Sequence, residues 1–433
     1  MSLASGSASA IGLLAAYEAA LANDPTYRAA YFENEAGKEN RLIGRAGLLP
    51  NISTSYSATK NRSDLETTSQ TALGAQTSLT HPQYISRSAM INLRQPIINF
   101  DATARYREGV AQSKVAAVQF TGRTQDLALR LVGAYLDALF ASEQLTLVTA
   151  QRDTYREQAS VNARLFEKGE GSRTDMIETQ ARLDLAEAQL IESQDNRKIA
   201  YDTLTTMIGQ EPGELAPLNA EFKVPPFSLG SFEEWKKTAL ANSAEIQTLI
   251  LQVEIAREQI NKGRAGHMPR LDFVANYGKQ NADTIATANQ ESTVRAIGIQ
   301  LQMPLYAGGQ VGAVTRQAAA SLERARFNLQ ASIDKAVIEV KKQHALVQSS
   351  TAKVEALEKA VASSKLLVKA TEQSIKGGVR INLDLLNAQQ QMYTSQRDLA
   401  QARYNYLLNG LRLRFAAGTL VFDDVRQVAS YFR

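Results

Sequence analysis

The chain carries the same order of sequence signals twice, and this internal repeat constrains its fold more than any other feature. The matching segments are Leu49-Pro50-Asn51 with Met268-Pro269-Arg270, Gln95-Pro96-Ile97 with Met303-Pro304-Leu305, and Thr174-Asp175-Met176-Ile177 with Leu383-Asp384-Leu385-Leu386. In each copy the signals predict a helix, a strand, a loop, a second strand, a very long helix, a glycine turn and a return helix. A repeat of this size indicates two similar units that pack side by side in one elongated body.

The composition along the chain gives the boundaries of the two copies. The first copy is expected to cover 13–209 and the second 233–418. Between them, 210–232 is rich in Pro, Gly and Glu, which predicts an equatorial linker with little regular structure. The tail at 419–433 is the counterpart of this linker.

The first residues, 1–12, are mostly small and resemble the end of a secretory signal with an A-x-A cleavage site. An arbitrary linker would have the same composition, so both interpretations stay open. If the segment is a signal remnant, the mature chain begins near Ile11 and leaves the cytoplasm.

Alternation of apolar and polar residues predicts one strand pair in each copy, at 48–96 and at 269–304. The residues expected on the apolar faces are Ile52, Thr54, Tyr56, Ala58, Ala89, Ile91 and Leu93 in the first pair, and Leu271, Phe273, Ala275, Tyr277, Ile297, Ile299, Leu301 and Met303 in the second. Residues 59–85 consist mainly of polar residues and are expected to form an exposed loop.

Two very long helices are predicted at 102–168 and 310–376, because neither segment contains proline. At 1.5 Å per residue, each would be roughly 100 Å long. The second has a sustained spacing of three and four residues, typical of a coiled-coil seam. Its members are Ile333, Ala336, Val340, Gln343, Val347, Ser350, Val354, Leu357, Val361, Ser364, Val368, Thr371 and Ile375. A weaker seam in the first helix comprises Leu127, Leu131, Ala134, Ala138, Ala141, Leu145 and Val148.

Glycine turns are expected to end both long helices, because glycine adopts the left-handed conformation that closes a helix. The turn residues are Gly169 and Gly171 in the first copy, and Gly377 and Gly378 in the second. Return helices are expected to follow at 172–209 and 380–418.

The strand pairs raise the question of what covers their apolar faces. Half-buried strands of soluble sheets alternate in the same way, but these pairs are inserted between helices, with no helix layer obviously available. An open sheet edge cannot lie in lipid, and four strands cannot close a membrane barrel, which needs about eight. If the strands are embedded in a membrane, several chains must therefore contribute to one barrel.

Composition argues against other function classes. The chain has no cysteine and a mild net charge of +4, without the one-sided basic stripe that nucleic-acid binding would require. The three histidines lie in unrelated segments at His81, His267 and His344, and no phosphate-binding glycine loop follows a strand. We therefore expect neither an enzyme nor a cofactor. No stretch approaches the 18 or more apolar residues of a membrane-spanning helix.

Several motifs resemble the TolC family of outer-membrane channel tunnels. They are Ala402-Arg403-Tyr404-Asn405-Tyr406-Leu407-Leu408-Asn409 with Leu411, Ala417-Gly418-Thr419-Leu420, the opening Ala19-Ala20-Leu21-Ala22-Asn23-Asp24-Pro25, and the strand-ending Pro96 and Pro304. The resemblance covers the chain from about Leu13 to Phe432. It is closest to the type I secretion members, among them the channel of an alkaline-protease exporter.

The resemblance implies a mainly α fold with a small β part. Three chains of four strands each would form a twelve-stranded β-barrel in the outer membrane of a Gram-negative bacterium, continued by a helical coiled-coil tunnel in the periplasm. The implied partners are two further copies of the chain, outer-membrane lipid, a periplasmic adaptor of the membrane fusion protein type and an inner-membrane ABC transporter.

The family narrows its tunnel at the glycine-turn end, which assigns the channel constriction to Asp384 and Asn387. Members with two acidic rings have a second acid where this chain has Asn387, so its constriction should be less acidic. Three copies of Asp384 meeting at a throat would repel one another and recruit a cation, which predicts cation preference and a cation block. The alternative is that Asp384 caps the return helix.

The resemblance also implies a gate latch at the same end. Arg380 resembles the arginine that ties inner to outer helices, and Asp175 resembles its carboxylate partner, with Thr174 beside it. Ile375 stands where a tyrosine helps latch the gate in other members, so this latch should be less hydrogen-bonded.

Three functions remain open at this point. The first is the exit duct of a type I secretion system that passes unfolded protein, and the second is the duct of a drug-efflux pump. The third is a soluble coiled-coil scaffold, which the strand pairs argue against because a scaffold has no use for them.

Overall fold

The computed structural model describes residues 11–72, 74–219, 222, 224, 230–282 and 290–432. Ten of the twelve residues of the expected signal remnant lie outside the described residues, as does part of the expected linker. The chain divides into two compact units, and each draws on both copies of the repeat. The helical unit comprises Met1–Asn34, Val118–Thr248 and Gln330–Arg433, and the sheet unit comprises Glu35–Ala117 and Leu249–Leu329.

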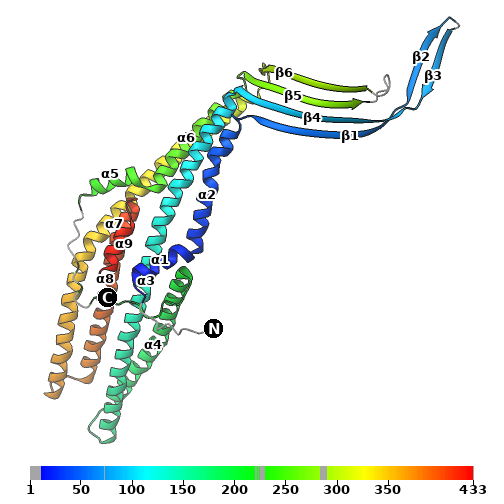
Figure 1. The fold of residues 1–433 in the computed structure, drawn as a ribbon. Helices are drawn as coiled ribbons and strands as arrows, with labels where there is room; N and C mark the ends of the chain where they lie inside the picture. Colours follow the sequence, from blue (N-terminus) through cyan, green and yellow to red (C-terminus); the bar gives the residue numbers. More distant parts are fainter. Residues whose placement is uncertain are drawn as a thin grey trace. The chain divides into compact units, whose positions relative to one another are not determined.

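The sheet unit is built on four antiparallel strands (Figure 1). They are β1 (Asn51–Arg62), β4 (Gln83–Ile98), β5 (Arg270–Ala282) and β6 (Gln290–Gln302), in the order β1-β4-β5-β6. The predicted strand pairs are confirmed, and β4 pairs with β5 along most of its length. The two copies of the repeat therefore share one continuous sheet.

The prediction of an exposed loop at 59–85 is wrong. The strand β1 continues to Arg62, and a second hairpin follows, formed by β2 (Leu65–Thr71) and β3 (Gly74–Thr80). Threonine favours strands because its branched Cβ fits the pleated backbone, even where both faces are polar. The hydroxyls of Thr68 and Thr77, for example, lie 3.2 Å apart across the hairpin. Without an apolar face, the hairpin lacked the alternation by which the other strands were recognised.

Four helices contribute to the sheet unit, namely α2 (Pro25–Ala46), α3 (Phe100–Glu167), α6 (Ala244–Ala265) and α7 (Gln310–Lys376). Close approach between α2 and α3 depends on small residues, since a Cβ at Gly109 would overlap the carbonyl oxygen of Asn40. The second copy has the equivalent contact, because a Cβ at Gly263 would lie 3.2 Å from Oγ1 of Thr315.

The helical unit contains the remaining helices. They are α1 (Leu13–Asn23), α4 (Arg173–Ile208), α5 (Phe232–Asn242), α8 (Asn382–Ala416) and α9 (Phe422–Ala429). The long and return helices begin and end within about two residues of the predicted positions. The tail is more regular than the linker it was compared with, because it contains α9, whose Val425 and Val428 are buried.

The predicted seam of α7 is confirmed, because the positions that recur at the three-four spacing are buried. The buried members are Val340, Gln343, Val347, Ser350, Val354, Val361, Ser364, Val368 and Thr371. In α3 the members Leu127, Leu131, Ala138 and Ala141 are buried. Two polar members of the α7 seam, Ser350 and Ser364, donate their hydroxyls to carbonyl groups one turn earlier.

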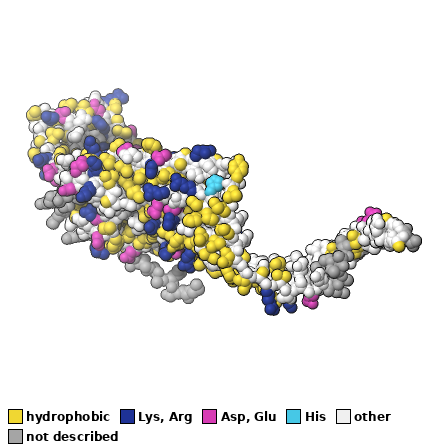
Figure 2. Space-filling model, turned by 90° about the horizontal axis from the view of Figure 1, so that it is seen from above, with side chains coloured by type: hydrophobic (Ala, Val, Ile, Leu, Met, Phe, Trp, Pro, Cys, Tyr) yellow, Lys and Arg dark blue, Asp and Glu magenta, His cyan; other side chains and the backbone are white. Residues whose placement is uncertain are grey.

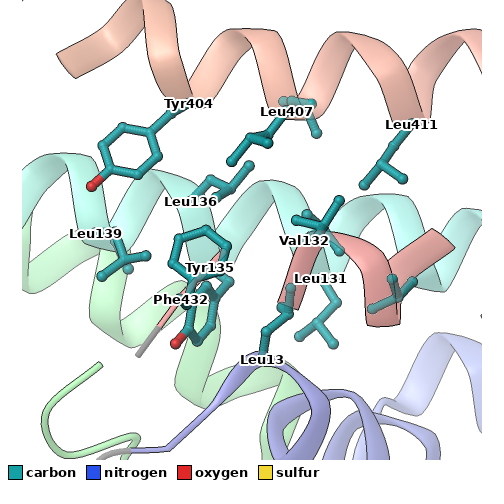
Figure 3. Packing of buried hydrophobic residues seen from close by; sticks show 14 of the residues in the cluster. Leu13, Leu131, Val132, Tyr135, Leu136, Leu139, Tyr404, Leu407, Leu411 and Phe432 are labelled. Atoms are coloured by element: carbon teal, nitrogen blue, oxygen red, sulfur yellow. The ribbon is translucent and has the colours of Figure 1, made fainter. Parts of the chain in front are cut away.

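The largest core cluster gathers around Tyr135 of α3 (Figure 3). Its ring meets that of Phe432 edge to face, with the centroids 5.8 Å apart. Its hydroxyl donates to the carbonyl of Ile11 at 3.0 Å and accepts from the N–H of Ala216 at 3.2 Å. Burial raises the pKa of Tyr135 to about 12. This one side chain therefore fixes the start of the described chain, the linker and the tail against α3.

One helix of the described chain, α3, contains an 18-residue window that is long and apolar enough to cross a membrane by length and composition. Of that window, 39% is buried. The same helix also supplies Leu127, Leu131 and Tyr135 to the core.

Two glycines with the same backbone conformation should respond differently to alanine. Gly378 (φ +72°) and Gly418 (φ +71°) are both left-handed, but only at Gly418 would a Cβ overlap a neighbour, the carbonyl oxygen of Asn242. We expect Gly378→Ala to cost about 1 kcal/mol of strain, and Gly418→Ala about 2–5 kcal/mol because overpacking is added. Thermal unfolding of the detergent-solubilised protein, followed by circular dichroism, measures both. Equal shifts in the unfolding temperature would contradict the packing at Gly418.

Candidate functional site

The first candidate site is the apolar face of the four-stranded sheet. The strand register places Ile52, Leu93, Ala275 and Ile297 in one row across all four strands. The adjacent row, on the opposite face, contains Ser53, Asn92, Asn276 and Ala296.

The apolar face is open to solvent in the single chain. Ile52 is 70% exposed and Ile297 79%, and hydrophobic side chains are visible at the surface of the strands (Figure 2). An exposed apolar sheet face of this extent requires a partner or a lipid environment.

The opposite face of the sheet contains a buried carboxylate. Asp272 of β5 is 1% exposed and accepts from Nε of Arg94 on β4 at 2.9 Å. Nε of Arg270 lies 3.0 Å from the same carboxylate. Two guanidinium groups thus compensate one desolvated charge and join the two copies of the repeat. This cluster could not be predicted from the sequence, because the pairing of β4 with β5 cannot be deduced from either copy alone.

Both edges of the sheet remain unpaired within the described chain. β1 and β6 each pair with one neighbour, and their outer edges present backbone N–H and C=O groups. Such groups have no hydrogen-bond partners in lipid, so a membrane-embedded sheet must be completed by further strands.

The second candidate site is the glycine-turn end of the helical unit. The N–H of Gly169 donates to the carbonyl of Phe166, and that of Glu170 to Leu165, both at 2.9 Å. At the other turn, Gly378 donates to the carbonyl of Ile375 at 2.9 Å. These bonds close the helices in the Schellman arrangement.

The left-handed position is occupied by Gly169 and Gly378, whose φ angles are +75° and +72°. The other two predicted turn glycines, Gly171 and Gly377, do not adopt it. Gly171 has a packing role instead, since a Cβ there would lie 3.0 Å from the Cβ of Leu165.

The predicted ion pair between Arg380 and Asp175 is not formed within one chain. Nη1 of Arg380 instead lies 3.8 Å from the carboxylate of Asp384, one turn along the chain, and both side chains are well exposed. Among the described residues, Asp175 takes part in no salt bridge. An exposed pair of this kind contributes about 0–1 kcal/mol, so it cannot by itself hold two helices together.

The alternative role of Asp384 as a helix cap is also not supported. The N-cap position of α8 is Ile381, and no side-chain hydrogen bond caps that end. Asp384 lies in the first turn, where the positive end of the helix dipole favours an acidic side chain. Its carboxylate is therefore free of a capping bond.

The hydroxyl of Thr179 links the helices at this end. It is fully buried, accepts from the side-chain amides of Asn162 (2.8 Å, α3) and Asn382 (3.1 Å, α8), and donates to the carbonyl of Asp175 (2.7 Å). A hydroxyl has one donor and two acceptor sites, and all three are used. Asp175 thus contributes its backbone carbonyl to this link, whereas the resemblance implied that its side-chain carboxylate pairs with Arg380.

A second link involves Asn387, the other predicted constriction residue. Its side-chain oxygen accepts from Nη2 of Arg182 on α4 at 3.0 Å; Asn387 is exposed and Arg182 is half-buried. The remaining latch residues make local contacts. The N–H of Thr174 donates to Oγ of Ser172, which caps α4, and Ile375 is half-buried.

Further along α8, its junction with α3 and α4 consists of an apolar contact and then a polar cluster. Leu386 is fully buried against Tyr155, Leu183 and Ala186. One turn further, Oε1 of Gln390 accepts from Nε2 of Gln151 at 2.8 Å. Burial raises the pKa of the Tyr155 phenol. Gln151 and Tyr155 extend the three-four spacing of the predicted α3 seam beyond Val148, so that spacing could have identified them.

In the part of the chain that the structure describes, no group of three or more acidic or histidine side chains is placed to hold a metal ion.

Removing the Thr179 hydroxyl tests the link between α4 and α8. In Thr179→Val the amides of Asn162 and Asn382 lose their buried acceptor, at a cost of about 1–3 kcal/mol. We expect faster hydrogen exchange of the backbone amides in the first turns of α8. Thr179→Ser retains the hydroxyl and should exchange much like the parent protein. Equal exchange in the Val and Ser variants would show that the hydroxyl does not hold α8.

Comparison with known proteins places the chain in a family. The family model described as outer membrane efflux protein matches residues 16–210 and 235–419, nearly the same stretches as the two copies of the repeat. The fold is that of solved outer-membrane channels. The Campylobacter jejuni CmeC outer membrane channel superposes with a TM-score of 0.82 over 97% of this chain and 89% of its own, at 15% identity.

Several curated proteins are similar in sequence over almost the full length. The alkaline protease secretion protein AprF of Pseudomonas aeruginosa is 40% identical, covering 98% of this chain and 88% of AprF. The proteases secretion protein PrtF of Dickeya chrysanthemi is 38% identical, covering 100% of this chain and 94% of PrtF. The outer membrane protein TolC of Vibrio cholerae is 30% identical, covering 95% and 92%.

These similarities confirm the resemblance to TolC and the mainly helical fold with a small sheet. The family match extends over both copies and accounts for the strands as well as the long helices. The chain belongs to the outer membrane efflux protein family.

Proposed function

We propose that three copies of this chain form an outer-membrane exit duct for a type I secretion system. The duct passes an unfolded polypeptide from an inner-membrane ABC transporter, through a periplasmic adaptor, to the exterior. The observation that carries this proposal is the sheet, which has one exposed apolar face, one polar face and two unpaired edges. A membrane barrel wall needs each of these properties.

The strands are long enough for this role. They contain 12, 16, 13 and 13 residues in β1, β4, β5 and β6, whereas a tilted membrane strand needs about 9–11. Three chains of four strands give twelve, within the range in which membrane barrels close. Pairing β1 of one copy with β6 of the next would satisfy every open edge. The apolar face would then contact lipid, and the polar face would line the lumen.

The glycine-turn end supplies the constriction in this proposal. Threefold symmetry would bring three Asp384 carboxylates toward the axis, while the Thr179 link and the Arg182–Asn387 link hold α8 against α4 within each chain. Opening would require α8 to part from α4 or from a neighbouring copy. Because these links are hydrogen bonds and one buried leucine contact, an adaptor could break them at modest cost.

Protein export is favoured over drug export by the similar proteins. AprF and PrtF, both named for protease secretion, are 40% and 38% identical to this chain over nearly its full length. Drug efflux is the second candidate, because the matching family model is described as outer membrane efflux protein. In either case the duct is passive, and the transporter supplies the energy.

A deletion strain separates the two candidates. Supplying the gene on a plasmid should restore secretion of the polypeptide that the partner ABC transporter exports. It should leave the drug sensitivity of the strain unchanged. Restored drug resistance without restored secretion would favour the efflux alternative.

Charge at the constriction should control the ions that the channel prefers. In planar bilayers, Asp384→Asn should reduce cation selectivity and weaken block by divalent cations, because it removes three negative charges from the throat. Asn387→Asp adds three at a nearby position and should have the opposite effect. Unchanged selectivity in both variants would place these residues away from the narrowest point.

A further inference from the structure

The apolar face of the sheet ends in a line of basic side chains. On each strand the apolar residues are followed, toward the end away from the helices, by a basic residue. These residues are Lys60 on β1, Arg87 on β4, Lys279 on β5 and Arg295 on β6, and all four are exposed. We call them the basic belt.

The belt runs diagonally across the sheet. Arg295 is in the row of Tyr277, and Lys279, two residues along β5, is in the row of Ala89. Arg87 lies one row further on β4, and Lys60, which pairs with Ile85, one row further again. Each step is two residues, about 7 Å along the strand for about 4.8 Å across it.

The apolar band beneath the belt shifts in the same direction. It comprises Leu301, Ile299 and Ile297 on β6; Leu271, Phe273, Ala275 and Tyr277 on β5; Leu93, Ile91 and Ala89 on β4; and Ile52, Thr54, Tyr56 and Ala58 on β1. Strands of a membrane barrel are tilted, so a flat boundary of the membrane crosses them as a diagonal. The belt therefore follows the edge of the apolar band that lies away from the helices, and it slopes in the same sense as that band.

Within the described strands, few acidic residues lie near the belt. Among the described residues, none of its four members forms an ion pair. The guanidinium of Arg295 lies over the ring of Tyr277, 5.7 Å from the centroid. One acidic residue of the described strands, Glu291, shares this face, and Arg62 lies beyond Lys60. At their helix end, the strands that the structure describes have no equivalent line of basic residues on the apolar face.

This asymmetry identifies the occupant by its charge. Given the proposed function, on which this inference rests, the strand ends away from the helices face the exterior. The outer leaflet there consists of lipopolysaccharide, whose lipid A carries phosphate groups directly above its acyl chains. We propose that the basic belt binds the lipid A phosphates, while the apolar band contacts the acyl chains. Each bound charge should contribute on the order of fivefold to the affinity.

Native mass spectrometry of the detergent-purified trimer tests this. The probe is bis-phosphorylated lipid A, and the variant is Lys60→Gln, Arg87→Gln, Lys279→Gln and Arg295→Gln combined. We expect binding at least tenfold weaker than in the parent protein. The matched control replaces four exposed lysines of α7 by glutamine and should bind normally. These are Lys341, Lys353, Lys365 and Lys369. Arg87→Lys with Arg295→Lys retains the charge and should also bind normally.

Other outcomes would overturn the proposal. Equal binding by the parent and the combined variant would exclude the belt as the site. Equal binding of the parent to phosphatidylglycerol and to lipid A would exclude lipid A as the specific occupant. Conductance of the same trimers in planar bilayers separates the two proposals. A parent protein that forms no channel contradicts the duct, whereas a conducting variant with undiminished lipid A binding contradicts only the belt.

Discussion

The four-stranded sheet of a single chain is incomplete, and the proposed assembly of several copies follows from this constraint. Its outer edges have unpaired backbone groups, and one of its faces is apolar and exposed. In water, exposure of the apolar face costs free energy. In lipid, the unpaired backbone groups of the open edges cost free energy instead. Closure with strands of other copies, as proposed, would remove both costs together. The internal repeat serves the same end, because pairing β4 with β5 joins two short hairpins into a wide sheet within each chain.

The helical unit has a different organisation. Its core is a packed cluster around Tyr135, whereas the glycine-turn end is held by a few hydrogen bonds around Thr179 and by the contact of Leu386 with Tyr155. Dense packing makes the first region rigid. The second resists opening through directional bonds that can be exchanged for water. The proposed gate would need this combination, because it would have to remain closed without a deep energy minimum.

Much of the fold could be predicted from the sequence. Period-two alternation located β1, β4, β5 and β6, and the three-four spacing located the seam of α7. The β2–β3 hairpin escaped because its threonine-rich strands are polar on both faces. The α9 helix escaped because eight residues are too few for a clear period.

The candidate site was predicted less well, for a physical reason. A resemblance assigns roles to positions, but it does not say which atoms meet. Arg380 meets Asp384, while Asp175 acts through its carbonyl group on Thr179. The Asp272 cluster depends on register between distant strands, and neither copy of the repeat encodes that register locally.

Closure between copies can be measured directly because the chain has no native cysteine. Cysteines introduced on the polar face at Ser53 of β1 and at successive even-numbered positions of β6 should form disulfides between copies in outer membranes. If three copies close one barrel, covalently linked dimers and trimers, and nothing larger, should form at one register. Monomers at every register, or an unlimited ladder, would contradict it.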